Sequence, residues 1–502
     1  MSALSALRKG SGLYEAVTIV ATSGTPESLW PAKPEKQILT LLLGSVLLIE
    51  LLQTQAFLKL YLDFSHGIPP VLIRKIFELN HKKTRRGHMK LTKEENAMLT
   101  GELGEPKRWA MEHMIMVGDV FDAVDFVSIS QAHMMGDTES LGDAGVEFLE
   151  NLADLAAGEI PLAVPMLTDP RGIDLSCYKK FGQNEEMANR ERRAMIACKN
   201  LGILMTDTCI NYQTIMPPVR GDHVAFGDTG VVIYTNSVLG AYSNFEGGPS
   251  ALAAGITGRT PRYGLHLEEN RQATKRFFVK DQPANLTDWG VLGGHIGRMC
   301  GSYWEVPVVE GIEICPSSDD MKHFGAAMAS FGSTPLFHIV GVTPEAPTLA
   351  SVRGEKIPKV TEIAKQDLDG FRSSFGKKGD KIDVVVFAAP QLSLVEMSAV
   401  AGLLEGKKIN KETALIVCTA PSVGADCDRL GITERIEASG AMVLRGTCFY
   451  QQYAREVAEA RGWKRLLSNS TKIVNIISGY GYEPALANME DCVASAIAGE
   501  IV

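Results

Sequence analysis

Short apolar runs alternate with helical segments along most of this chain, and no other feature constrains its fold as strongly. We interpret these apolar runs as buried strands: Pro161–Leu167, Gly230–Tyr234, Pro335–Val340, Ile382–Phe387, Ala414–Cys418 and Ala441–Leu444. The segments with helical patterning between them include Asn184–Asn200, Asp319–Ala329, Leu394–Leu404 and Gln452–Arg461. Because buried parallel strands are continuous apolar runs joined by helices, the alternation predicts an α/β fold with mostly parallel sheets.

The length of 502 residues is too great for one simple core, so roughly two or three domains are expected. A new domain begins near Met89, where Thr92 and Glu95 have the spacing of a capping box ahead of a helical segment. We therefore divide the chain into an N-terminal extension (1–88), an α/β domain (89–290) and a second α/β region (291–502).

The extension contains a long apolar segment, residues 38–62, which raises the question of a membrane span. A span needs about 20 predominantly apolar residues. Glu50, Gln53, Gln55 and Lys59 interrupt this segment, and the uninterrupted part is too short. We expect a packed helix or an accretion that is not part of the working protein, and a form tethered to a membrane through this segment is the weaker alternative.

Charge and cysteine content exclude several classes of protein. A net charge of −9 gives no sign of a nucleic-acid surface. The nine cysteines are scattered, without a CxxC pair, which favours a reducing, cytoplasmic setting. The glycines between Gly290 and Gly297 lack the strand–turn–helix context of a nucleotide fingerprint, and no P-loop or G-x-S-x-G elbow occurs. The absence of these motifs argues against a kinase, an ordinary dehydrogenase and a serine hydrolase.

Polar residues cluster where the predicted strands end, and this is how α/β proteins build sites. His133 is expected in a polar loop after the apolar run Val124–Ile129, close to Ser130. The other candidates in this clustering are Cys209, Asp228, Asn236, Ser237, Glu246 and Gly247. Each also has a plain structural explanation: a buried free cysteine, a satisfied histidine, or a carboxylate that caps a turn.

Cys209 and Cys448 each follow a short apolar run and a threonine, so they could converge on a metal or an iron–sulfur cluster. Cys300 and Cys418 are candidates for a third ligand, although each is better explained as a structural residue. Lys472, in Asn-Ser-Thr-Lys, could hold an anionic substrate or lie solvated at the surface.

From Met89 to Val502 the chain resembles aconitase X, a divergent branch of the aconitase superfamily. The resemblance rests on motifs in one order: MKLTKEENAMLTGELG, SISQAH, TDTC, NSVLGA, EGGPSALAAGITGRTPRYG, LFHIVGVTPEAP, GTC and NSTK. It implies an aconitase-like multi-domain α/β hydro-lyase that uses an iron–sulfur cluster or iron held by cysteines. Known activities in the family include dehydration of cis-3-hydroxy-L-proline and of phosphomevalonate. A smaller swivelling domain, fused or as a separate subunit, supplies a catalytic serine.

By this resemblance Cys209 and Cys448 are metal ligands, but the chain departs from the family at several positions. Ala389 stands where a third cysteine is expected, and Gln391 stands where a histidine is expected. Tyr242 and Phe245 occupy positions of arginines that would grip an anion. Asp228 appears where a glutamate is usual.

The resemblance therefore implies metal-assisted elimination of water from a small hydroxy acid, such as a hydroxyproline-like substrate. We assign His133, Asp228 and Lys472 to catalysis, and Cys209 and Cys448, with Cys300 as the candidate third ligand, to the metal. Substrate binding is assigned to Ser130, Asn236, Ser237, Glu246 and Gly247. A small swivelling-domain subunit is the expected partner. The alternative is a non-catalytic relative that has lost its cluster.

Overall fold

The computed structural model describes residues 89–354 and 358–502. The N-terminal extension, with the apolar segment 38–62, lies outside these described residues. Within the described ranges, none of the helices combines the length and the hydrophobicity that a membrane crossing requires.

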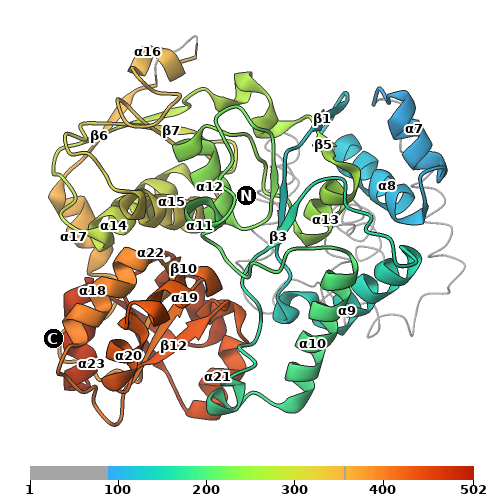
Figure 1. Ribbon diagram of the computed structural model, residues 1–502. Coiled ribbons are helices and arrows are strands. Elements are labelled where there is room, and N and C mark those ends of the chain that lie inside the picture. The colour runs from blue at the N-terminus through green and yellow to red at the C-terminus, as the bar shows by residue number, and fades with distance from the viewer. Residues whose placement is uncertain (1–88, 355–357) are drawn as a thin grey trace, which may run out of the picture. The chain divides into compact units, whose positions relative to one another are not determined.

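Three parallel sheets and one antiparallel pair of strands organise the described residues (Figure 1). The parallel sheets have the strand orders β3-β2-β4, β8-β7-β6-β9 and β12-β11-β10-β13-β14, and β1 pairs with β5. The strands are β1 (Phe126–Ser128), β2 (Ala132–Met134), β3 (Met166–Thr168), β4 (Ala225–Phe226), β5 (Arg259–Pro261), β6 (Lys275–Val279), β7 (Pro307–Glu310), β8 (His338–Ile339), β9 (Val360–Ile363), β10 (Val384–Leu392), β11 (Ala414–Thr419), β12 (Met442–Arg445), β13 (Arg465–Ser468) and β14 (Glu483–Leu486). The predicted α/β fold with mostly parallel sheets is confirmed.

Helices make the connections between the strands. The longer ones are α7 (Lys93–Thr100), α8 (Glu105–Val120), α9 (Thr138–Leu155), α10 (Glu185–Asn200), α13 (Gly248–Thr257), α14 (Leu286–Cys300), α15 (Ser318–Gly332), α17 (Lys365–Arg372), α18 (Leu394–Leu404), α19 (Pro421–Arg429), α21 (Ala454–Arg461) and α23 (Met489–Ala498). The shorter ones are α11 (Asn211–Thr214), α12 (Thr229–Tyr234), α16 (Leu349–Val352), α20 (Ile432–Ala438) and α22 (Thr471–Ile476). The capping box between Thr92 and Glu95 is present at the start of α7, as predicted.

The third sheet has a central strand, β10, that is buried along its whole length. Val384, Val385, Val386 and Phe387 of β10 are fully buried, as expected for a central strand that is covered on both faces. In Figure 1 the orange and red elements α18 to α23 gather around β10 and β12. At the sheet's carboxyl edge lie Gln391, near the end of β10, Cys448, after β12, and Lys472, in helix α22 after β13.

One predicted strand is wrong: residues 230–234 form most of helix α12. The Asp228 carboxylate accepts hydrogen bonds from the backbone N–H groups of Gly230 and Val231, at 2.8 and 3.0 Å, and so caps the helix. Every residue from Gly230 to Tyr234 is buried, so the segment is apolar on all sides. A short, uniformly apolar run gives no periodicity by which a helix could be told from a strand.

The glycine-rich segment between Gly290 and Gly297 lies inside α14, where it allows close packing on α15. A Cβ atom at Gly293 would lie 2.1 Å from the carbonyl oxygen of Phe324, and one at Gly297 would lie 2.5 Å from that of Met328. These glycines are needed because the two helix backbones touch. Their role in packing agrees with the absence of a nucleotide fingerprint.

Candidate active site

Six buried polar side chains from distant parts of the chain meet where parallel strands end, and they interact electrostatically. They are His133 in β2, Asp169 directly after β3, Cys209, Asp228 two residues after β4, Cys448 after β12, and Lys472 in α22 after β13. Ligands of open α/β sheets bind at this carboxyl edge. The structure thus brings together five residues that the sequence indicated and one that it did not.

Lys472 and Asp228 form a buried ion pair at the centre of this group. The Lys472 Nζ lies 3.1 Å from Asp228 Oδ2, and each side chain is only 3% exposed. Burial disfavours both charges, but the pair outweighs it, so the pKa of Asp228 is lowered and that of Lys472 is raised. The N-terminus of α12 also favours the Asp228 carboxylate. At neutral pH the site therefore holds a fixed ammonium and a fixed carboxylate.

His133 lies within strand β2, so the prediction that it follows a strand in a polar loop is wrong. Its side chain is fully buried, and Nε2 lies 2.9 Å from the carbonyl oxygen of Thr208. A carbonyl only accepts, so Nε2 carries the proton and Nδ1 has a free lone pair. Nδ1 has no hydrogen-bond partner among the described residues. Because burial lowers the pKa of His133, the ring is neutral at pH 7 and can accept a proton.

Asp169 is the site residue that the sequence analysis missed. Gln451 Nε2 donates to its Oδ2 at 2.7 Å, and His133 Nε2 lies 3.7 Å from its Oδ1. Burial, reinforced by the Asp228 carboxylate and the Cys209 thiol, raises the pKa of Asp169 well above its usual value. The available signal was the Thr-Asp-Pro-Arg-Gly turn at the end of β3, since such turns present carboxylates at the sheet edge.

Cys209 and Cys448 are both buried, and their thiols share a hydrogen bond. This bond, together with burial, raises the pKa of Cys209 well above its usual value. The Cys209 Sγ also accepts a hydrogen bond from the backbone N–H of Gln391, at 3.3 Å. The structure therefore brings together the two cysteines of the predicted metal site.

A third thiolate is missing from this pair. Cys300 lies at the end of α14, where its polar neighbours are Lys275, Glu305 and Thr334, and the structure does not bring it to Cys209. Ala389, at the expected third position, is fully buried in an apolar cluster that also contains Cys418 and Cys448. In residues 89–354 and 358–502, no group of three or more histidine, cysteine or acidic side chains is arranged to hold a metal ion. The residues present therefore do not fit a cluster held by three thiolates.

Most of the predicted substrate-binding residues already have partners within the protein. The Asn236 amide, in the π-helical turn Thr235–Leu239, bonds to the backbone of Ser243 and Pro335, and Ser237 Oγ accepts from the N–H of Phe337. Glu246 is buried and accepts a hydrogen bond from Thr260. Ser130 is exposed and bonds to Asp222, and Gly247 is the exposed N-cap of α13.

The two aromatic residues at expected arginine positions pack against neighbouring side chains. The Tyr242 ring lies under the guanidinium of Arg271, 4.2 Å from its carbon, and Phe245 meets Tyr303 edge to face. Arg271 is itself buried and paired with Glu345. This part of the structure therefore binds its own arginine internally, so Arg271 does not replace the missing arginines.

Comparison with known proteins gives matches along almost all of the described chain. Sequence profiles described as the aconitase X first, second and third domains match residues 88–269, 273–373 and 382–498. The crystal structure of Thermococcus kodakaraensis aconitase X in its holo-form superposes with a TM-score of 0.72 at 32% identity, covering 81% of this chain and all of that one.

Two characterised kinds of enzyme are among the relatives. The phosphomevalonate dehydratase large subunit of Methanothermobacter thermautotrophicus is 36% identical over 394 residues, which are 78% of this chain and 95% of that protein. The cis-3-hydroxy-L-proline dehydratase of Pseudomonas aeruginosa is 29% identical over 81% of this chain but only 69% of its own length. Both names describe enzymes that remove water.

Proposed function

This chain belongs to the aconitase X family and is a hydro-lyase, and from that premise we propose that it eliminates water from a small hydroxy acid. The observation that carries the proposal is the buried Lys472–Asp228 pair beside neutral His133, whose Nδ1 has no partner among the described residues. The site thus holds a cation (Lys472), a proton acceptor (His133) and a proton donor (Asp169) away from water. Elimination of water requires these three groups.

Each step can be assigned to a residue of this chain. His133 Nδ1 takes the proton from the carbon beside the substrate carboxylate, and the electron pair left behind forms the carbon–carbon double bond. As the carbon–oxygen bond breaks, the carboxyl group of Asp169, whose pKa burial raises well above its usual value, gives its proton to the departing hydroxyl, which leaves as water. Lys472 stabilises the negative charge that grows on the carboxylate, and Asp228 keeps Lys472 protonated and oriented.

The family relationship suggests an iron–sulfur cluster or iron, and Cys209 and Cys448 are the residues that would face it. Because the third ligand position is Ala389, the described residues do not offer a complete set of donors, and none of these steps depends on iron. Dehydratase relatives at 29–36% identity favour an active enzyme over the alternative of a non-catalytic relative.

The substrate that we favour is a non-phosphorylated, hydroxyproline-like acid. Phosphomevalonate and cis-3-hydroxyproline, the substrates named for the relatives, both carry the hydroxyl group one carbon beyond the carbon beside the carboxylate. Tyr242 and Phe245 replace arginines that would bind an additional anionic group, and this substitution disfavours a phosphorylated ligand.

A separate small subunit is the partner that we propose. The phosphomevalonate dehydratase relatives are named large subunits, and this chain matches them over almost their whole length. The hydroxyproline dehydratases, in contrast, extend well beyond the part that this chain matches. The nine free cysteines support a reducing, cytoplasmic setting.

The test is deuterium incorporation, followed by proton NMR, with the full chain alone and with its small subunit. Exchange at the carbon beside the carboxylate reports the base even when turnover is slow, and loss of the hydroxyl-bearing carbon signal reports elimination. We expect both with cis-3-hydroxyproline or a related acid, and neither with the Lys472→Met variant. Absence of exchange and elimination with every hydroxy acid, in the presence of the small subunit, would refute the proposal.

A further inference from the structure

Gln391 occupies the position where the family resemblance places a histidine, and its side chain is completely buried between two loops and the end of strand β11. The side-chain nitrogen donates to the carbonyl oxygens of Asp207, Thr419 and Thr447, at 3.2, 3.3 and 3.1 Å. The side-chain oxygen accepts from the backbone N–H of Cys209, at 3.3 Å. An amide NH₂ has two hydrogens, so three carbonyl groups share two donors, and no other side chain of this size supplies the same set.

These contacts connect the segments that carry the cysteine pair. Asp207 lies two residues before Cys209, and Thr447 directly precedes Cys448, so both loops are bonded to one amide group. The backbone N–H of Gln391 additionally donates to the Cys209 sulfur. A neutral histidine has a single N–H and could not satisfy all of these carbonyl oxygens.

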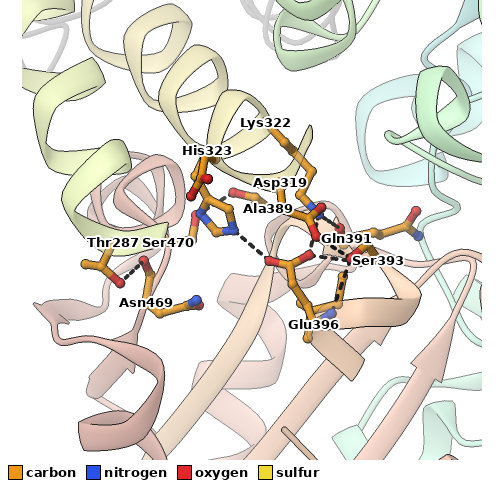
Figure 2. Close-up of polar contacts among 12 residues, drawn as sticks. Thr287, Asp319, Lys322, His323, Ala389, Gln391, Ser393, Glu396, Asn469 and Ser470 are labelled. Atoms are coloured by element: carbon orange, nitrogen blue, oxygen red, sulfur yellow. Dashed lines mark hydrogen bonds and ion pairs between the residues drawn. The ribbon is translucent and has the colours of Figure 1, made fainter. Parts of the chain in front are cut away.

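The backbone around Gln391 is held as firmly as its side chain. Figure 2 shows Lys322 of α15 between Gln391 and Glu396: its Nζ donates to the Gln391 carbonyl oxygen at 3.3 Å and is ion-paired with the Glu396 carboxylate. Glu396 in turn bonds to His323, at 2.7 Å. On the other side, Ser470 Oγ donates to the carbonyl oxygen of Ala389 at 2.5 Å.

We propose that Gln391 is the positioning residue of the cysteine pair: its amide holds the Cys209 and Cys448 loops in place, so that the site assembles without a bound metal. Where a third ligand would connect these loops through a metal, this chain connects them through hydrogen bonds to protein groups. The buried Lys322–Glu396 pair fixes the end of β10 from which the Gln391 side chain reaches the loops.

The importance of Gln391 for activity rests on the proposed function of the site. The test of its positioning role does not, because the test needs no substrate. The full chain, treated with a chelator, is labelled with a thiol reagent under native conditions, and the rate at each cysteine is measured by peptide mass spectrometry. In Gln391→Ala, Cys209 and Cys448 should react at least about tenfold faster than in the wild type, because several buried hydrogen bonds that resist local opening are lost. Cys492, a buried residue within α23, should react at an unchanged rate.

The matched control is Asn244→Ala, which removes another buried amide cross-link, between Tyr263, Leu265 and Tyr303. It should lower the melting temperature without accelerating labelling of Cys209 or Cys448. Gln391→Glu keeps the shape of the side chain but loses the donor. If Gln391→Ala does not fold, Gln391→Glu takes its place, with the same faster labelling of Cys209 and Cys448 expected. The wild type also tests the inference: labelling of Cys209 and Cys448 that becomes fast only after chelation would overturn it. Labelling of these two cysteines at the wild-type rate in the Gln391 variants would overturn it as well.

Discussion

The ammonium of Lys472 lies 3.1 Å from the carboxylate of Asp228, although the two residues are 244 positions apart and both are buried. One belongs to the last β/α connections of the chain, and the other caps α12 after a strand of the first parallel sheet. This buried charge pair therefore connects the part of the site that follows the first parallel sheet with the part that follows the C-terminal sheet.

Removing one member of the pair should be strongly destabilising. Lys472→Met leaves the Asp228 charge buried without its partner, and we expect a loss of about 3–5 kcal/mol in the free energy of unfolding. The double variant with Asp228→Asn should lose roughly 2 kcal/mol less than the sum of the single variants, because the uncompensated charge is removed. Urea denaturation of the four proteins measures both quantities, and additive losses would show that the pair does not interact.

The proton acceptor can be tested separately from the fold. In His133→Gln the amide can still donate to the Thr208 carbonyl oxygen, but it is no base, so dehydration should slow by roughly a hundredfold or more. Its melting temperature should stay near that of the wild type, whereas His133→Phe, which also loses the donor, should melt earlier. Full activity in His133→Gln would exclude His133 as the base.

Glu191 should impose a pH dependence on stability. Burial raises its pKa from the usual 4.5 to about 7, so the folded protein binds more protons than the unfolded chain between these values. Stability therefore falls as pH rises from about 4.5 to about 7, by about 3 kcal/mol from this group. Glu191→Gln should flatten this slope in denaturation experiments between pH 4.5 and 8, whereas Glu112→Gln at an exposed helix position should not. An unchanged slope in Glu191→Gln would contradict the assignment.

Restoring an arginine should restore anion binding. Phe245→Arg places a guanidinium at a half-buried position where the family resemblance expects one, and we predict roughly tenfold tighter binding of a phosphorylated hydroxy acid. Phe245→Met, which adds no charge, is the control. Isothermal titration calorimetry measures the affinity, and equal affinities for the two variants would count against an anion site at this position.

A third thiolate should change the metal content. We expect the wild type, reconstituted anaerobically with iron and sulfide, to retain less than one cluster per chain, and Ala389→Cys to retain more. Ala388→Cys, one residue earlier, and Ala389→Cys combined with Cys209→Ala should both stay at the wild-type level. Iron and acid-labile sulfide per chain, with the absorption spectrum, decide the question; a full cluster in the wild type would show that two cysteines suffice.

Much of the fold could be predicted because its signals are local. The helices at Asn184–Asn200 and Leu394–Leu404 and the strands at Ala414–Cys418 and Ala441–Leu444 appear within a few residues of their predicted bounds. The run at Gly230–Tyr234 was misassigned because its helical form depends on the Asp228 cap and on burial from all sides. His133 was placed after a strand for a similar reason, since β2 is short and its pairing with β3 and β4 is not encoded locally.

The sequence by itself determined the α/β class, the capping box that begins helix α7, and the kinds of polar residue at the strand ends, because periodicity, capping and composition act over a few residues. Only the tertiary structure decided which of these groups meet. Asp169 receives its hydrogen bond from Gln451, 282 positions away, and Gln391 reaches Cys209 across 182 positions. Such pairings depend on how separate sheets place their carboxyl edges, and the resulting burial sets the charge states of the site.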